Sequence, residues 1–149
     1  MRLSVTTPRG ALVDTEVEEI VAPGALGEMG ILPGHIPLMS ALKPGVLVYR
    51  TKDHSGIVAV GQGFLQVAPV EAAPAAGGAA AAHPSDRVLV LVDQALPAAG
   101  IDRAAAERDL AQADAELAQW KRELDGAYQA LLVRRSWAAA RVDAAARAH

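Results

Sequence analysis

Residues 27–45, with the sequence GEMGILPGHIPLMSALKPG, constrain the fold more than any other part of this 149-residue chain. The stretch holds four glycines and three prolines among apolar residues, and its charged side chains are Glu28 and Lys43. Proline lacks the amide donor that a central strand needs, so Pro33 and Pro37 exclude one continuous buried strand. Glycine supplies turn conformations that other residues avoid. The stretch therefore predicts short strands joined by tight turns.

The composition narrows the classes of protein to which the chain can belong. Apolar residues make up 52% of it but aromatic residues only 3%, so Val, Leu and Ile must supply the core. Cysteine is absent, which excludes disulfides and thiolate metal sites. The net charge of −3 argues against nucleic acid as a partner. No apolar run reaches the roughly 20 residues of a membrane-spanning helix, and the polar start is unlike a signal peptide. Any membrane association is therefore expected to be indirect.

Residues 1–97 have the pattern of a β domain. The runs that predict strands are 3–5, 12–21, 46–50, 57–60, 64–67 and 88–92. Two of these runs, 46–50 and 57–60, flank a polar segment and predict a hairpin. Within 12–21, Val17 and either Ile20 or Val21 are expected to face the core. Many short strands with frequent turn residues predict an antiparallel sandwich or barrel.

Residues 69–86 interrupt this pattern with a run rich in alanine, glycine and proline. Because large anchoring side chains are scarce there, we interpret the run as a flexible hairpin loop. A short alanine helix over 79–82 is the alternative, although four residues are too few for a stable isolated helix.

After residue 97 the pattern becomes helical. Asp102 is placed to cap a first helix over 103–124. The apolar seam of this helix alternates spacings of four and three residues and consists of Ala106, Leu110, Ala113, Leu117, Trp120 and Leu124. Asp125 and Gly126 supply a break, and a second helix is expected over 128–147. The short connection predicts an antiparallel helical hairpin.

No combination of residues typical of a catalytic centre stands out. The phosphate-binding GxxxxGK and zinc-binding HExxH motifs are absent. Gly61-Gln62-Gly63 begins like a dinucleotide fingerprint, but Gln66 occupies the third glycine position, and a corner between strands is expected instead. His35 has no catalytic partner at a suitable spacing and is interpreted as a structural or interface residue. We expect no cofactor and no metal site.

Charged residues are distributed unevenly in the second helix. Its arginines are Arg134, Arg135, Arg141 and Arg147, against one acid, Asp143. Arg134 and Arg141 lie seven residues apart and so share a helix face. A solvated surface and a basic face that docks on an acidic partner both explain this pattern.

The order of these segments resembles the epsilon subunit of bacterial F-type ATP synthases. The resemblance is carried by VTTPRGALVDTEVEEIVAPG, GEMGILPGHIPLMSALKPG, VAVGQGFLQVAP and VLVLVDQA, followed by the helical hairpin. It covers nearly the whole chain, and the second segment is its most specific part. The resemblance implies an antiparallel β-sandwich of about ten strands over residues 1–97. A regulatory two-helix hairpin over 98–149 is implied to follow it.

The resemblance also implies a function and partners. The chain is expected to be a non-catalytic rotor subunit of the proton-translocating ATP synthase, peripheral on the cytoplasmic face of the bacterial membrane. The sandwich is implied to bind the gamma subunit and the ring of c subunits. The turn implied to touch the c-ring is Glu28, Met29 and Gly30. The residues implied to face gamma are His35, Pro37, Leu38 and Met39.

The helical hairpin is mobile in this family, which implies a regulatory role. Folded against the sandwich, the helices permit ATP hydrolysis; extended alongside gamma, they inhibit it. Arg134, Arg135 and Arg141 match the basic residues expected to contact an acidic segment of the beta subunit.

The chain departs from one family motif. Some members bind ATP through I/L-D-x-x-R-A at the start of the first helix. Ile101 and Asp102 match and are weak candidates for ATP binding, but Ala105 stands where Arg is expected. The next expected Arg position holds Gln112. A site without those cations would bind phosphates weakly, so we expect little or no ATP binding.

A free-standing β-sandwich adaptor whose helical hairpin grips a protein partner is the alternative interpretation. An enzyme is a third. Neither accounts for residues 27–45, and identification of the binding partners would distinguish the three.

Overall fold

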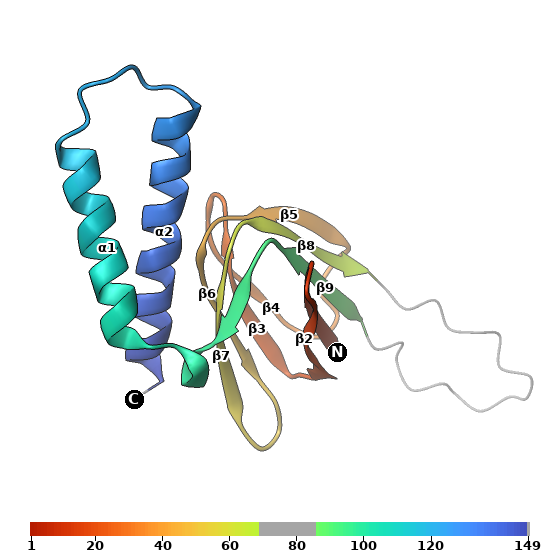
Figure 1. Cartoon of the computed structure of the whole chain (residues 1–149). Coiled ribbons are helices and arrows are strands. Elements are labelled where there is room, and N and C mark those ends of the chain that lie inside the picture. Colours follow the sequence, from red (N-terminus) through yellow and green to blue (C-terminus); the bar gives the residue numbers. More distant parts are fainter. Residues whose placement is uncertain (69–85, 149) are drawn as a thin grey trace, which may run out of the picture.

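The computed structural model describes residues 1–68 and 86–148, which form ten strands and two long helices (Figure 1). The strands are β1 (Arg2–Thr7), β2 (Gly10–Glu16), β3 (Glu19–Gly24), β4 (Gly27–Ile31), β5 (Leu38–Leu42), β6 (Gly45–Arg50), β7 (Ser55–Val60), β8 (Gly63–Ala68), β9 (Arg87–Val92) and β10 (Ala95–Pro97). A 3₁₀ turn, η1 (Ala98–Gly100), leads into helices α1 (Arg103–Ala118) and α2 (Gly126–Arg147). The loop expected over 69–86 lies, except for Asp86, outside the described residues.

The strands form one ladder in the order β10-β7-β6-β3-β5-β8-β9-β1-β2, with β4 paired to β3. β3 and β5 are joined only through Gly24 and Leu42, so the ladder divides there into two halves. Side chains from both halves meet in one core, which makes the arrangement a sandwich. The expected sandwich of about ten strands is confirmed. One pairing departs from the antiparallel pattern, because β1 and β9 run parallel.

The core of the sandwich consists of large aliphatic side chains. Leu3, Ile20, Ile31, Leu47 and Leu65 are all fully buried. They come from strands of both halves, and along β1 and β8 the buried positions alternate with more exposed ones. The expectation that Val, Leu and Ile supply the core is confirmed, and no aromatic ring is buried in it among the described residues.

The proline- and glycine-rich stretch 27–45 forms two short strands and the turns around them, as predicted. Pro33 and Pro37 lie between β4 and β5, where no ladder hydrogen bond is required. Gly34 has a φ of +84°, a conformation that side chains with a Cβ rarely adopt. Its amide donates to a carboxylate oxygen of Asp86, which ties this turn to the start of β9.

The single strand expected over 12–21 is in fact two strands. β2 ends at Glu16 and β3 begins at Glu19, because the chain crosses here between the two halves of the sandwich. Val17 lies in this crossing and is only 4% exposed, as expected of a core residue. The choice between Ile20 and Val21 falls on Ile20, which is fully buried.

The helical hairpin is confirmed, but its turn differs from the prediction. The first helix ends at Ala118 rather than at residue 124, and Leu124 is 73% exposed. The Trp120 indole nitrogen donates to the Glu123 carbonyl, and its ring lies 5.5 Å from that of Tyr128. These contacts stabilise a folded link outside the helix. Asp125 does not end α1; it caps α2 by accepting hydrogen bonds from the amides of residues 127 and 128.

The hairpin packs on the sandwich through α2, with α1 on its far side (Figure 1). A second apolar cluster forms this contact and includes Val46 and Ala59 of the sandwich with Ala144 of α2. Trp137 and Ile101 pack around it. None of the described helices has the length and apolarity needed to cross a bilayer.

Candidate interaction surfaces

An apolar face covers the outer side of β5, β8 and β9. Met39 is 67% exposed, Phe64 57% and Leu91 49%. Phe64 lies directly across from Leu91 on β9 and from Ala41 on β5. Met39 is two residues from Ala41 and therefore shares its face of the sheet. Exposed apolar side chains gathered on adjacent strands are typical of a protein-binding surface.

Of the residues expected to face gamma, Met39 belongs to this apolar face, and His35 and Pro37 precede it in the chain. His35 is half-buried, and its Nδ1–H donates to the carbonyl oxygen of Ile36 at 2.7 Å. Pro37 is exposed, whereas Leu38 packs partly against the core. The structure therefore brings together Met39, Pro37 and His35 at the surface and turns Leu38 inward.

The residues expected to touch the c-ring do not form a turn. Glu28, Met29 and Gly30 lie within β4, and the turn is at residues 25–26, where Leu26 is fully exposed. The prediction missed this because glycines at 27 and 30 resemble turn residues, although they pair with β3. Glu28 and Gly30 are exposed, while Met29 packs partly against the core. The Arg147 guanidinium lies 3.9 Å from the Glu28 carboxylate.

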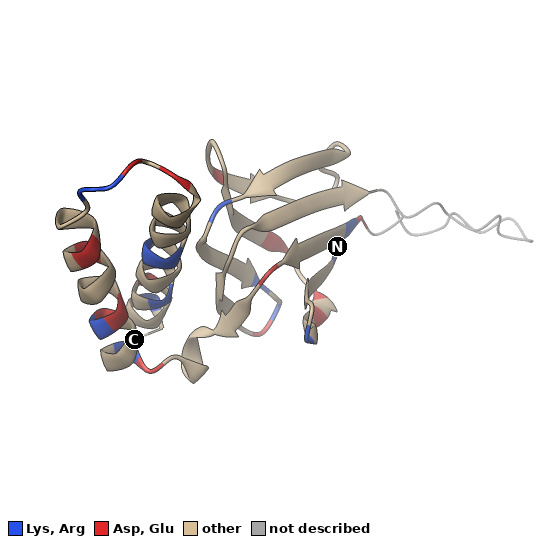
Figure 2. Cartoon of the chain, turned by 45° about the horizontal axis from the view of Figure 1, so that its top comes forward, with Lys and Arg blue, Asp and Glu red and all other residues tan. Residues whose placement is uncertain are grey.

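The basic face of α2 is turned toward α1. Three of its arginines pair with acids of α1: Arg134 Nη2 lies 3.1 Å from Glu116 Oε1, Arg135 Nε 2.5 Å from Asp114 Oδ1, and Arg141 Nη2 2.8 Å from Asp109 Oδ2. Figure 2 shows the charges of the two helices on facing sides of the hairpin. This pairing within the hairpin was not predicted from the sequence, and docking of the basic face on an acidic partner stays a prediction.

The two candidate ATP-binding residues both have structural roles. Asp102 caps α1, since its carboxylate accepts a hydrogen bond from the Ala105 amide at 3.0 Å. Ile101 packs against the cluster between the hairpin and the sandwich. In the folded chain, both side chains are therefore engaged in capping or packing contacts.

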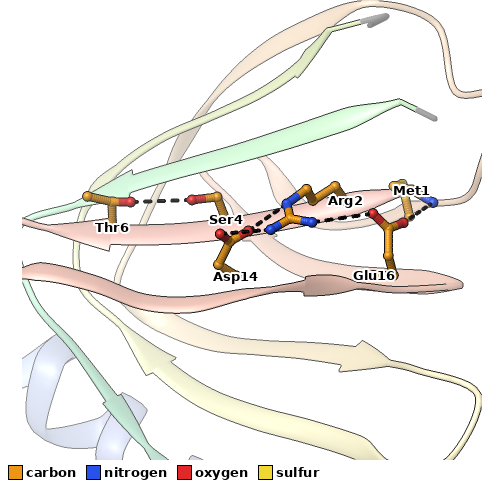
Figure 3. Close-up of polar contacts among 6 residues, drawn as sticks. All are labelled: Met1, Arg2, Ser4, Thr6, Asp14 and Glu16. Atoms are coloured by element: carbon orange, nitrogen blue, oxygen red, sulfur yellow. Dashed lines mark hydrogen bonds and ion pairs between the residues drawn. The ribbon is translucent and has the colours of Figure 1, made fainter. Parts of the chain in front are cut away.

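A polar group on β1 and β2 is the most clearly perturbed electrostatic feature (Figure 3). Arg2 Nε donates to Asp14 Oδ1 at 2.8 Å and Nη2 to Oδ2 at 3.0 Å. These hydrogen bonds hold the pKa of Asp14 below its ordinary value, and the same contacts raise the pKa of Arg2. The Met1 amine lies 3.3 Å from Glu16 Oε2. The group stabilises the edge of the sandwich and has no feature of a catalytic site.

The described residues contain no group of three or more His, Asp or Glu side chains placed to hold a metal ion. A depression of about 550 Å³ is lined by residues 15–18 and 51–54 among others, and Glu16 and His54 are two of its ionisable residues. Both belong to contacts already formed, Glu16 with the Met1 amine and His54 with the hydroxyl of Thr51 at 3.1 Å.

Comparison with known proteins identifies the family. A family model for the β-sandwich domain of ATP synthase delta/epsilon chains matches residues 1–80. An ATP synthase epsilon chain of Anaeromyxobacter is 35% identical over 147 residues, which are 99% of this chain and 98% of the relative. The chain belongs to the ATP synthase epsilon family. It is thus a subunit of the ATP synthase complex, as the order of its sequence segments predicted.

Other members of the epsilon family and solved structures agree. Epsilon chain 2 of Syntrophotalea carbinolica is 38% identical over 117 residues, 78% of this chain and 73% of the relative. In the mitochondrial ATP synthase of Euglena gracilis, solved with its F1 sector and c-ring, one chain matches with a TM-score of 0.72 at 21% identity, covering 99% of this chain and 80% of that one. A chain of the Tetrahymena thermophila central stalk and c-ring matches with a TM-score of 0.57 at 19% identity, covering 97% and 96%. At these identities the two structures show a shared fold.

Within this epsilon fold, the sequence prediction missed two members of the apolar face. Phe64 and Leu91 were placed in strands, but their outward orientation was not identified. The signal was present in residues 88–92, VLVLV, because an unbroken apolar strand indicates that both faces of the sheet are covered. One face of β9 meets the core, so the other face is available to a partner.

Proposed function

We propose that this chain is a non-catalytic component of the central stalk of a bacterial proton-translocating ATP synthase. The complex would hold it at the cytoplasmic face of the membrane, and it would couple the catalytic head to the c-ring. The observation that carries this proposal is the exposed apolar face of β5, β8 and β9 on a chain of the epsilon family. A rotor component needs a firm interface with its neighbours, and a contiguous apolar surface provides one.

The gamma subunit is the proposed partner of the apolar face. Met39, Phe64 and Leu91 would supply its centre, with His35 and Pro37 at its border. Large apolar and aromatic side chains at the centre of an interface commonly contribute most of the binding free energy. Leu38 would act indirectly, because its partly buried side chain positions the neighbouring residues of β5.

The β3–β4 hairpin is the proposed contact with the c-ring. Leu26 at its tip is fully exposed, and Glu28 and Gly30 lie exposed on β4 beside it. Gly30 has open space around its Cα, so a partner's backbone could approach closely there. Met29 would support the hairpin from the core side rather than touch the ring.

The helical hairpin is proposed to be a brake on ATP hydrolysis. In the described conformation the hairpin is folded against the sandwich, which corresponds to the permissive state. Release of α2 would bring Arg134, Arg135 and Arg141 to the acidic segment of the beta subunit. Several weak ion pairs formed together would shift a nearly balanced equilibrium toward the inhibited state.

ATP is not part of this proposed regulation. Ala105 and Gln112 provide none of the positive charge that phosphate oxygens require. Asp102 would bring a carboxylate near those oxygens while it caps α1. We expect calorimetry with the full chain to detect no micromolar ATP binding.

A binding titration with purified gamma subunit tests the proposed interface. Phe64→Asp and Met39→Asp each place a charge at the centre of the apolar face and should weaken binding by at least about tenfold, equivalent to about 1.4 kcal/mol. Ser55→Asp adds the same charge at an exposed position on β7 and should leave affinity unchanged. Equal affinities for all four folded proteins, wild type included, would contradict the proposed surface.

A further inference from the structure

The arginines of α2 are already engaged within the hairpin. Arg134 donates through Nη1 and Nη2 to the two carboxylate oxygens of Glu116, at 3.3 and 3.1 Å. A guanidinium bound in this forked geometry has those donors occupied, so a second carboxylate cannot bind them at the same time. Arg135 and Arg141 pair with Asp114 and Asp109 in the same way but through single donors. An external acidic partner that binds these same donors must therefore displace the acids of α1.

The apolar contact that holds α1 is thin. Its buried side chains are Ala106 and Ala113, and Leu110 and Leu117 are only half-buried. Among the described residues, the contacts of α1 are concentrated on α2, whereas α2 also packs on β6, β7 and η1. Alanine buries little apolar area, so the ion pairs between α1 and α2 supplement a small apolar contact.

The ion pairs themselves are easily exchanged. Arg134 and Arg135 retain side-chain exposures of 45% and 44%, so water and salt weaken their pairs. Arg141 is less exposed, at 18%, but its Nε is buried without a hydrogen-bond partner in the described part of the chain. Its guanidinium also lies 5.6 Å from the centre of the Trp137 ring, so Arg141 is held more firmly than the two exposed arginines. Two exposed ion pairs, one partly buried pair and a small apolar seam form an attachment that a more strongly binding acidic partner would displace.

We propose that Asp109, Asp114 and Glu116 are internal competitors for the acidic partner of α2. They occupy Arg134, Arg135 and Arg141 in the folded hairpin and so set the threshold at which an external acidic segment binds. This inference rests on the proposed braking role of the same arginines. It has one distinctive consequence: the arginine and the acid of each ion pair have opposite effects on the affinity for the external acidic segment. Neutralising the arginines removes the binding residues, whereas neutralising the acids releases them.

Two triple variants of the full chain test this consequence. In the first, D109N, D114N and E116Q remove the competitor; in the second, R134Q, R135Q and R141Q remove the binding residues. The probe is a synthetic glutamate-rich helical peptide, titrated at low and high salt. The first variant should bind it about three- to tenfold more tightly than wild type, as expected from releasing two or three weak pairs. The second should show no binding, and high salt should reduce the difference between wild type and the first variant.

A matched control distinguishes release of the α2 arginines from the effect of a changed net charge. The variant E18Q, E107Q and E123Q neutralises the same number of carboxylates outside the interhelical pairs; Glu107, for example, pairs with Arg103 on its own helix at 2.8 Å. Its affinity for the peptide should stay near that of wild type. Tighter binding by this control equal to that of the first variant, or weaker binding by both interhelical variants, would overturn the internal competition.

A second readout distinguishes this inference from the proposed brake. In the reconstituted complex, the acid-neutral variant should inhibit ATP hydrolysis more strongly than wild type, and the arginine-neutral variant less. If peptide binding changes as expected while hydrolysis rates are identical, the internal competition stands and the brake is overturned. If peptide binding does not respond to removal of the acids, the internal competition is overturned whatever the hydrolysis rates.

Discussion

The sandwich and the helical hairpin of this chain are packed by different means. The core of the sandwich consists of Leu, Ile and Val side chains that are almost completely buried. The hairpin buries chiefly alanine, with Leu131 as its one large buried side chain among the described residues. Ion pairs between α1 and α2 supplement this small apolar area.

This difference separates a permanent structure from a releasable one. Burying a leucine contributes roughly 1.5–3 kcal/mol, so each lost core contact is costly and the sandwich opens only by unfolding. A seam of alanines and exposed ion pairs contributes much less for the same length of chain. The two helices of the hairpin are therefore able to separate from each other at a free-energy cost that a binding partner compensates. Four substitutions test the comparison, from the largest expected effect to the smallest.

Leu65→Ala tests how much the core packing of the sandwich contributes to stability. Leu65 is fully buried at the centre of β8, and removing its side chain leaves a cavity that the surrounding strands fill only in part. We expect the free energy of unfolding to fall by about 2–5 kcal/mol in a urea titration. Leu124→Ala, at the exposed tip of the hairpin, should change it by less than about 0.5 kcal/mol. Similar losses for both variants would show that exposure does not distinguish the two regions.

Ala113→Leu tests whether the contact between α1 and α2 can open while the sandwich stays folded. Ala113 is fully buried on the face of α1 that meets α2, so a larger side chain forces the helices apart at a cost of about 1–3 kcal/mol. Amide hydrogen exchange should become faster throughout α1 while the strands keep their protection. Ala115→Leu places the same side chain on the exposed face of α1 and should have no such effect. Uniform loss of protection in sandwich and hairpin would mean that the two regions do not open separately.

Asp125→Ala tests how much the helix cap at the start of α2 contributes to the order of the hairpin. Its side chain accepts hydrogen bonds from the Ala127 and Tyr128 amides, and loss of a helix cap costs about 1 kcal/mol. Chemical shifts should report fraying of the first turn of α2 without change in the sandwich. Asp125→Asn keeps an oxygen acceptor at this position and should retain most of the helix. A first turn that is equally ordered in both variants would show that the Trp120 link, and not the cap, sets the start of α2.

The smallest expected effect is the pH dependence contributed by Asp14. Its pKa is lowered in the folded state, chiefly by the hydrogen bonds from Arg2. The carboxylate therefore stabilises the sandwich fully above its unfolded pKa of about 3.9, and this contribution is lost as pH falls through the lowered folded pKa. Asp14→Asn should remove that component, so wild type and variant should converge in stability at acid pH. A difference that grows as the solution becomes more acidic would reverse the assigned sign.

The parts of the structure that followed from the sequence were those with a strong local pattern. The β6–β7 hairpin was predictable because two apolar runs flank a polar turn, and the cap at Asp102 because of its position before a regular apolar seam. The end of α1 at Ala118 was not predictable, since the apolar seam of the first helix continues in the sequence through Trp120 and Leu124. Contacts of Trp120 with Glu123 and Tyr128 override that pattern.

The surfaces were harder to predict than the fold. Alanine occurs on every side of α2, so its packed face gave no periodic signal. The pairing of Arg141 with Asp109, 32 positions apart, depends on how the two helices of the hairpin align along each other. The outward orientation of Phe64 depends in the same way on the pairing of β8 with β5 and β9. Such features follow from tertiary structure, which periodicity within one segment does not encode.

The parallel pairing of β1 with β9 determines when the sandwich can be completed. β1 finds one neighbour, β2, within the first residues of the chain, but its other neighbour begins only at Arg87. Contacts between segments so distant in sequence form slowly, because the intervening chain must first lose conformational freedom. During synthesis the first strand therefore stands with one unpaired edge until residues 87–92 have left the ribosome. Over that interval an unpaired strand edge is a site where strands of other chains can pair, and pairing with β9 closes it.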